Sequence, residues 1–223
     1  MMNTHINHRI DPILHDKPEQ FPYIVIDNLY DKEELKGIWK ELNFLEDKLP
    51  DHVEQHLGSS ATQGNVKLKA SKGISLDTFY TERKSSNILK YNRKIFDVLV
   101  KLKEDKLGLT FFFKNLHCNY DQSSVAYYEN KDYYKSHWDI AKVTCLTWLH
   151  KEPKRYTGGD LIFTDYDIKI DCISNRCVIF PGSIEHEVTQ ISMDKKYIGK
   201  GNGRWTIVQF LYERYDNRDN LDG

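Results

Sequence analysis

The chain has 223 residues, of which 39% are hydrophobic and 13% aromatic, enough to bury one substantial core. Its 32 Lys and Arg side chains nearly balance 33 Asp and Glu side chains, so the charge gives no signal for nucleic-acid binding. No apolar run approaches the ~18 residues needed to span a bilayer, which predicts no membrane partner. Residues 1–10 lack the apolar stretch of a secretory signal, so we expect a cytoplasmic protein.

The first helix is predicted from its start signal and from its apolar spacing. We expect residues 1–20 to be a polar arm and residues 21–223 to form one domain, of which Phe21–Asp27 indicates the first strand. Asp31 and Glu34 have the spacing of a capping box, in which each side chain accepts a hydrogen bond from the other residue's N–H. Apolar residues then follow at helical spacing and predict a helix over 32–45: Leu35, Ile38, Trp39, Leu42 and Leu45.

A second helix is predicted over Ser86–Leu107. Its buried stripe would consist of Ile88, Leu89, Ile95, Phe96, Leu99, Val100 and Leu102. We expect both helices to cover the outside of a sheet. The polar segment 47–83 between them is either a lid that orders over a substrate or a surface loop.

From about residue 120 the composition favours β-strands. Val143–His150, Asp160–Thr164, Arg176–Pro181 and Gly203–Tyr212 are rich in β-branched and aromatic residues. Gly158 and Gly159 predict a turn before the second of these strands. Residues 193–202 predict an extra hairpin excursion. The four cysteines fall in or beside predicted strands, and we expect buried free thiols.

His137, Asp139 and His186 are candidate metal ligands. Residues i and i+2 of an extended strand project to one face, so His137 and Asp139 can converge while Trp138 points away into packing. Two imidazoles and one carboxylate can occupy one face of an octahedral metal and leave the other open, the pattern of non-haem Fe(II) oxygenases. A lone H-x-D pair is more often a surface histidine beside an aspartate, so the prediction depends on the strands that follow.

Taken in order, these motifs resemble the catalytic core of the 2-oxoglutarate- and iron(II)-dependent dioxygenases, most closely the prolyl 4-hydroxylase-like branch. The resemblance covers about residues 123–212, with a weaker match from Phe21. It implies an α+β, mainly β fold: a double-stranded β-helix, or distorted jelly roll, with buttressing helices on one face. The domain would then consist of a helical and lid part, 21–110, and a jelly-roll core, 111–213.

The resemblance also implies roles for single residues. His137, Asp139 and His186 would bind iron, and Arg204 would pair with the C5 carboxylate of 2-oxoglutarate, since a guanidinium meets a carboxylate bidentately. Tyr128 would reach the same carboxylate, unless a one-residue register slip puts Tyr127 there. The long stretch before Arg204 leaves three lysines as rival anchors: Lys195, Lys196 and Lys200. Thr206 or Thr144 would offer a hydroxyl to the cosubstrate. Four residues are candidates for the pocket: Tyr127, Tyr134, Thr144 and Trp148.

By this resemblance the chain is an oxidoreductase, a hydroxylase that binds Fe(II), uses 2-oxoglutarate and O2 as cosubstrates and releases succinate and CO2. Its substrate would be a peptidyl proline or another protein side chain. One alternative is an oxygenase of the same fold that acts on a small molecule or a nucleobase. Residues 204–210 carry a single basic residue, which disfavours a nucleic-acid partner. The other alternative is a metal-binding jelly roll without enzymatic activity.

Overall fold

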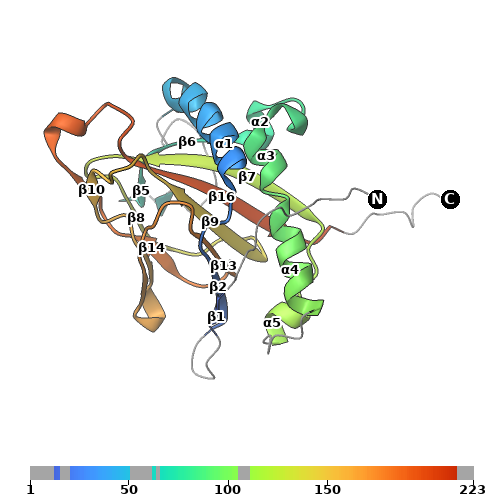
Figure 1. Cartoon of the computed structure of the whole chain (residues 1–223). Helices are drawn as coiled ribbons and strands as arrows, with labels where there is room; N and C mark the ends of the chain where they lie inside the picture. The colour runs from blue at the N-terminus through green and yellow to red at the C-terminus, as the bar shows by residue number, and fades with distance from the viewer. Residues whose placement is uncertain (1–12, 16–20, 51–61, 64–65, 105–110, 215–223) are drawn as a thin grey trace.

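A computed structural model describes residues 13–15, 21–50, 62–63, 66–104 and 111–214 (Figure 1). The larger of its two main sheets has seven strands in the order β1 (Ile13–His15), β2 (Tyr23–Ile26), β13 (Cys177–Pro181), β9 (Val143–Leu149), β16 (Arg204–Tyr212), β7 (Tyr120–Tyr128) and β6 (Lys72–Ser75). The smaller has five, in the order β12 (Ile168–Ile170), β11 (Leu161–Phe163), β14 (His186–Val188), β8 (Tyr133–His137) and β5 (Lys69–Ala70).

All strand pairs in the described residues are antiparallel, and two short ladders lie outside the main sheets. These join β10 (Tyr156–Thr157) to β15 (Ser192–Met193), and β3 (Thr62–Gln63) to β4 (Val66–Lys67). The main sheets pack through a shared cluster, in which Trp148 and Val178 of the larger sheet join Leu161 and Phe163 of the smaller one. The predicted mainly β, double-stranded β-helix architecture is confirmed.

The first helix begins and ends where the sequence predicts. α1 spans Lys32–Leu45, and the capping box is present: Glu34 N donates to Asp31 Oδ1, and Asp31 N donates to Glu34 Oε2, both over 2.9 Å. Its apolar stripe is buried at Ile38, Leu42 and Leu45. A short 3-10 helix, η1 (Glu46–Lys48), follows it.

The second predicted helix is two helices, α3 (Asn87–Tyr91) and α4 (Lys94–Glu104), while residues 105–107 lie outside the described part. Asn92 interrupts it because its polar groups bond elsewhere: Nδ2 donates to Ser123 Oγ over 3.0 Å, and its carbonyl accepts from Gln209 Nε2 over 3.2 Å. The break turns the apolar stripe of α4, so Val100 is 53% exposed and Val98 is buried instead.

Helices α1, α3 and α4 lie on one side of the larger sheet, as predicted (Figure 1). Their buried residues form one cluster with side chains of β7, β9, β13 and β16. Two shorter helices and three further 3-10 turns complete the described part of the fold: α2 (Leu76–Phe79), α5 (Phe111–Lys114), η3 (Arg83–Ser85), η4 (Thr164–Tyr166) and η5 (Lys195–Tyr197). The opposite face of the sheet is left for the functional site.

The segment 47–83 is not one loop. Residues 51–61 and 64–65 lie outside the described part, but β5 pairs with β8 and β6 pairs with β7. The segment therefore supplies an edge strand to each main sheet. The predicted division at residue 110 does not follow the sheets, because β2, β5 and β6 precede that position. Residues 13–15 of the predicted arm also pair with β2.

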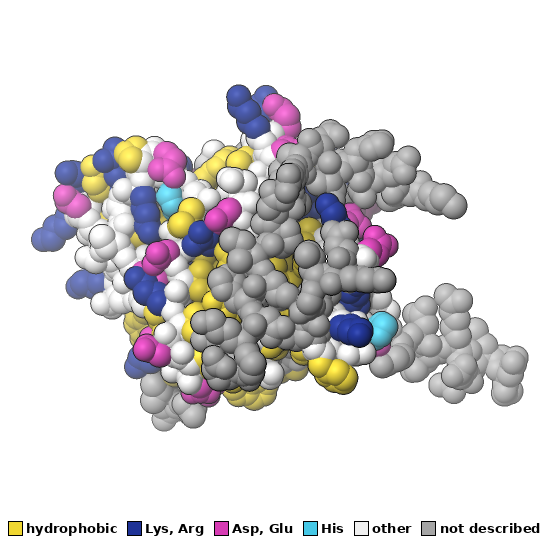
Figure 2. All heavy atoms as spheres, turned by 60° about the horizontal axis from the view of Figure 1, so that its bottom comes forward, with side chains coloured by type: hydrophobic (Ala, Val, Ile, Leu, Met, Phe, Trp, Pro, Cys, Tyr) yellow, Lys and Arg dark blue, Asp and Glu magenta, His cyan; other side chains and the backbone are white. Residues whose placement is uncertain are grey.

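The surface carries charges of both signs. On the face shown in Figure 2, Lys and Arg side chains alternate with Asp and Glu side chains, and neither sign gathers into one region. None of the helices in the described ranges combines the length and the apolar character that crossing a bilayer requires.

Candidate active site

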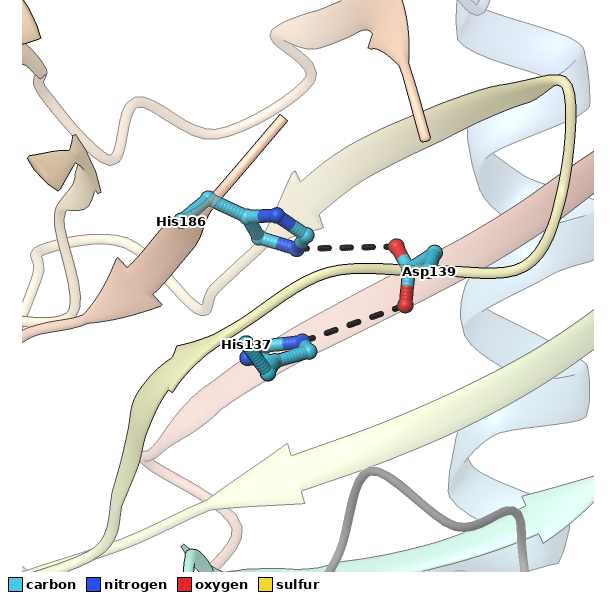
Figure 3. Close-up of side chains that lie close together, drawn as sticks. All are labelled: His137, Asp139 and His186. Carbon is cyan, nitrogen blue, oxygen red and sulfur yellow. Dashed lines mark ion pairs between the residues drawn. The ribbon is translucent and has the colours of Figure 1, made fainter. Parts of the chain in front are cut away.

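The structure brings His137, Asp139 and His186 together (Figure 3). One ligand atom from each lies within 4.8 Å of the others. The two histidines face each other because β14 pairs with β8 in the register that sets His186 opposite His137. Asp139 completes the set, with Oδ1 at 3.9 Å from His137 Nε2 and Oδ2 at 3.5 Å from His186 Nε2.

Strand alternation does not explain this convergence, so that part of the prediction is wrong. β8 ends at His137, and Asp139 lies in the following loop, where its N–H donates to Gly182 O over 2.8 Å. Gly182 permits this close approach, since a Cβ there would lie 2.2 Å from the carbonyl oxygen of Ala141. Trp138, expected in the core, is 55% exposed and lines the cavity mouth because the strand has already ended.

Backbone carbonyls orient both imidazoles. His137 Nδ1 lies 2.9 Å from Lys135 O, and His186 Nδ1 lies 2.8 Å from Ile184 O. With Nδ1–H donating to a carbonyl, Nε2 keeps its lone pair for a metal, as metal-binding histidines require. Burial, aided by the neighbouring His186, lowers the pKa of His137 to about 3, so its ring is neutral at physiological pH. Asp139 Oδ2 in turn accepts from Thr144 Oγ1 over 2.7 Å.

The triad opens into a cavity of about 570 Å³ between the sheets, within the range of small-molecule sites. Arg204, the first residue of β16, lines the cavity and is fully buried. Within the described part of the chain, its three guanidinium nitrogens have no hydrogen-bond partner. Its Cζ lies 4.9 Å from the Tyr128 ring centroid and 5.6 Å from that of Trp148. A buried cation without an anion is costly, which indicates a missing anionic ligand.

The glycine turn before β11 makes room for Arg204. Gly159 has φ +76°, and a Cβ there would lie 2.9 Å from Arg204 Cδ. The rival lysines lie elsewhere. Lys195, Lys196 and Lys200 are exposed around η5, in an excursion with a 3-10 turn in place of the predicted hairpin, and none lines the cavity.

Of the two neighbouring tyrosines, Tyr128 is the one that faces the cavity. Arg204 pairs with Tyr128 across β16 and β7, and the Tyr128 ring lines the cavity. Burial raises the pKa of Tyr128 to about 12, although the Arg204 charge opposes the shift. The pocket prediction for Tyr127 is wrong, because alternation turns it to the helix-covered face, where its hydroxyl accepts from Gly203 N over 2.9 Å.

The remaining predicted pocket residues divide by what their polar atoms contact. Thr206 lines the cavity, and its buried hydroxyl has no partner among the described residues. The pocket prediction for Thr144 is wrong, because its hydroxyl donates to Asp139 and the residue does not line the cavity. Trp148 is buried behind the cavity wall, in the cluster between the sheets, so its pocket placement is also corrected. Tyr134 lines the cavity and stacks on His137 with ring centroids 3.5 Å apart.

Lys69 is a cavity residue that the sequence did not reveal. It lies on β5, within the segment predicted to be a lid or loop, and is only 9% exposed. Its Nζ lies 4.6 Å from the Tyr134 ring centroid. A lysine in a polar segment carries no signal of burial, because its position follows from the pairing of β5 with β8.

The sequence comparison agrees with the geometry. Residues 123–212 match the 2OG-Fe(II) oxygenase superfamily, which covers β7 through β16 and includes the triad and Arg204. No curated protein matches the chain. The resemblance inferred from the motifs is confirmed, and this part of the chain belongs to the 2OG-Fe(II) oxygenase superfamily.

Solved structures share the fold over most of the chain. A prolyl-4-hydroxylase from Pseudomonas putida is 12% identical, with a TM-score of 0.59 over 86% of this chain and 93% of that one. A prolyl hydroxylase from Trichoplax adhaerens, in complex with a hypoxia inducible factor peptide fragment, is 16% identical, with a TM-score of 0.56 over 85% and 83%. A viral collagen prolyl hydroxylase from Paramecium Bursaria Chlorella virus-1 is 14% identical, with a TM-score of 0.53 over 90% and 96%.

The family defines the class of enzyme. The protein is an oxidoreductase, a 2-oxoglutarate-dependent dioxygenase that uses Fe(II), 2-oxoglutarate and O2. The residues present fit these groups, because two imidazole nitrogens and a carboxylate converge at the wall of the cavity. A buried guanidinium without a partner lines the same cavity, as a dicarboxylate cosubstrate requires.

Proposed function

We propose that His137, Asp139 and His186 hold Fe(II), and that Arg204 binds the C5 carboxylate of 2-oxoglutarate. We further propose that the enzyme hydroxylates a C–H bond of a peptidyl proline or another protein side chain. The observation that carries the first proposal is the unpaired guanidinium of Arg204 in the cavity that the triad lines. One molecule of a five-carbon diacid could bind both at the triad and at the Arg204 guanidinium.

The chain's own residues prepare the site in a defined way. Lys135 O and Ile184 O keep Nε2 of the two histidines free, and Thr144 holds the Asp139 carboxylate. The Thr206 hydroxyl and the Tyr128 ring lie on the same cavity wall as Arg204 and would bind the cosubstrate beside it. When bound, Fe(II) would supply the chemistry by which O2 oxidises both 2-oxoglutarate, with release of succinate and CO2, and the C–H bond of the substrate.

The shape of the cavity supports an extended substrate. It continues from Arg204 along the inner face of β16 to Phe210 and Tyr212. Exposed apolar side chains at its mouth, Trp138 and Ile140, offer contacts to a chain that lies across the opening. The Trichoplax adhaerens hydroxylase is in complex with a peptide fragment, which favours a peptide for this chain too.

Metal binding and turnover test the ligand assignment. We expect His137→Ala and Asp139→Ala to lose Fe(II)-dependent conversion of 2-oxoglutarate to succinate by at least about a thousandfold. Both variants should also bind Mn(II) more weakly in a titration followed by electron paramagnetic resonance. His117→Ala, at an exposed histidine outside the cavity, is the matched control. Wild-type turnover and metal affinity in either ligand variant, with folding intact by circular dichroism, would remove the assignment.

The substrate class is tested separately. A proline-containing peptide library should gain one oxygen atom on proline, as read by tandem mass spectrometry, and the same library with alanine at those positions should not. Active conversion of 2-oxoglutarate without modification of any peptide would contradict the peptide proposal and leave the cosubstrate proposal standing.

A further inference from the structure

Lys69 adds a second cation to the cavity that Arg204 lines. Its strand, β5, is the edge of the smaller sheet and pairs Lys69 with Tyr134 of β8. Its Nζ lies 4.6 Å from the Tyr134 ring centroid and 5.8 Å from that of Tyr128. Arg204 pairs with Tyr128 across β16 and β7, and its Cζ lies 4.9 Å from the Tyr128 ring centroid. Tyr134 also stacks on His137, which places Lys69 near the triad end of the cavity.

Among the described residues, no carboxylate lies within ion-pair distance of Lys69. Its contacts are the faces of two aromatic rings, which stabilise an ammonium less than an anion does. Burial lowers the pKa of Lys69 to about 7; the Asp139 carboxylate opposes this shift and the Arg204 charge adds to it. A buried lysine in this setting gains most from a ligand that brings a negative charge.

The charges of the proposed complex show which ligand is missing. A divalent iron and the Arg204 guanidinium are balanced by Asp139 and the two carboxylates of 2-oxoglutarate. Glu185, the other acidic residue that lines the cavity, is exposed, and its Oε2 accepts from Ser136 Oγ over 2.7 Å. Solvent screens that charge, so it does little for Lys69. When it is protonated, Lys69 therefore brings a positive charge that the metal and cosubstrate leave unbalanced.

We propose that Lys69 is a second carboxylate-binding residue of this cavity, which holds a carboxylate beside Tyr134 and apart from the Arg204 subsite. The proposal rests on the proposed function, because it counts the charges of Fe(II) and 2-oxoglutarate. Charge balance favours a carboxylate of the substrate: an acidic side chain, or a free carboxyl terminus, near the carbon to be oxidised. The cosubstrate is the other source of the same group, and the experiment distinguishes the two.

Three variants isolate the charge of Lys69. Lys69→Met keeps the length of an unbranched chain and removes the ammonium, and Lys69→Arg keeps a cation. Lys72→Met makes the same change at an exposed lysine on β6, outside the cavity. If Lys69 only supported the fold, Lys69→Met would lower Tm. We expect Tm of the metal-free protein to be unchanged or raised, because an unpaired buried charge is removed.

The first measurement is the Kd of 2-oxoglutarate in Mn(II)-loaded protein by calorimetry. The second is Tm with saturating 2-oxoglutarate, which occupies Arg204, in acetate or in acetamide at matched ionic strength. We expect acetate, but not acetamide, to raise Tm of wild type, Lys69→Arg and Lys72→Met, and to leave Lys69→Met unchanged. Loss of this response with an unchanged 2-oxoglutarate Kd assigns the carboxylate to the substrate. If the Kd of 2-oxoglutarate is at least about tenfold higher in Lys69→Met alone, the carboxylate that Lys69 binds belongs to the cosubstrate.

A Lys69→Met protein that matches wild type in both measurements would overturn the proposal. Failure of the proposed function would look different. In that case wild-type protein loaded with Mn(II) would not bind 2-oxoglutarate at all, and the Arg204 and triad variants would behave as wild type does.

Discussion

The two faces of β16 differ in how their polar groups are satisfied. Trp205, Ile207 and Leu211 point to the helix-covered face and join its core cluster. The alternate positions face the cavity: Arg204, Thr206, Val208, Phe210 and Tyr212. One strand thus supplies both the wall of the core and the wall of the site, because successive side chains point to opposite faces of a sheet.

On the helix-covered face, buried polar groups have partners. Gln209 Nε2 donates to Asp121 Oδ2 over 3.0 Å and to Asn92 O over 3.2 Å. Asp121 also accepts from Arg83 Nη2 over 2.9 Å and from Arg93 Nη1 over 2.8 Å. This network ties α3, η3 and β7 to β16, so it stabilises the fold without a ligand.

On the cavity face, the corresponding groups lack partners. The Arg204 guanidinium and the Thr206 hydroxyl have none among the described residues, and the Trp148 indole N–H behind them also has none. Most buried polar groups in proteins are hydrogen-bonded. The contrast therefore teaches that polar groups left unsatisfied on one face of a well-bonded sheet indicate where a ligand binds.

The largest effect is expected at Arg204. Arg204→Met should weaken 2-oxoglutarate binding by about 2–5 kcal/mol, the usual loss when one member of a buried charged pair is removed. Its free energy of unfolding in the absence of ligand should not fall, since the charge has no partner there. Calorimetry on Mn(II)-loaded protein and urea unfolding measure the two quantities. Arg204→Lys should lie between wild type and Arg204→Met, and equal Kd values in all three would move the anchor to another residue.

A smaller effect separates the two faces within β16. Gln209→Leu should lower the free energy of unfolding by about 1–3 kcal/mol, because it removes two buried hydrogen bonds, to Asn92 O and to Asp121 Oδ2. Thr206→Val, three residues away on the cavity face, removes a hydroxyl that has no partner and should leave the unfolding free energy within about 0.5 kcal/mol of wild type.

In ligand binding we expect the opposite order, with the larger effect in Thr206→Val and the smaller in Gln209→Leu. We expect Thr206→Val to weaken 2-oxoglutarate binding several-fold and Gln209→Leu to leave it unchanged, as read by calorimetry under conditions where both variants are folded. Similar stability losses in the two variants would show that the faces do not differ as described.

The smallest effect is expected far from the cavity, at the start of α1. Asp31→Ala removes the side chain that caps Glu34 N and should cost about 1 kcal/mol of unfolding free energy. Asp31→Ser keeps a capping oxygen and should restore most of it. Urea unfolding measures the cost, and 2-oxoglutarate affinity should be unchanged. A clear change in that affinity would show that α1 and the cavity are coupled.

Local patterns in the sequence determined much of this protein. The capping box and apolar spacing predicted both ends of α1, since those interactions lie within a few residues of one another. The motif order predicted the sheet-rich architecture and named the residues that converge, His137, Asp139 and His186, along with Arg204 in the same cavity. Such residue types in that order already imply one kind of chemistry.

Contacts between distant segments decided the rest. Gly182 O holds Asp139 after β8 has ended, and Asn92 bonds to β7 and β16 where the sequence favours a continuous helix. Strand register chose Tyr128 over Tyr127, and the pairing of β5 with β8 brought Lys69 into the cavity. None of these has a local signature, because each depends on partners that are brought close only when the two sheets pack together.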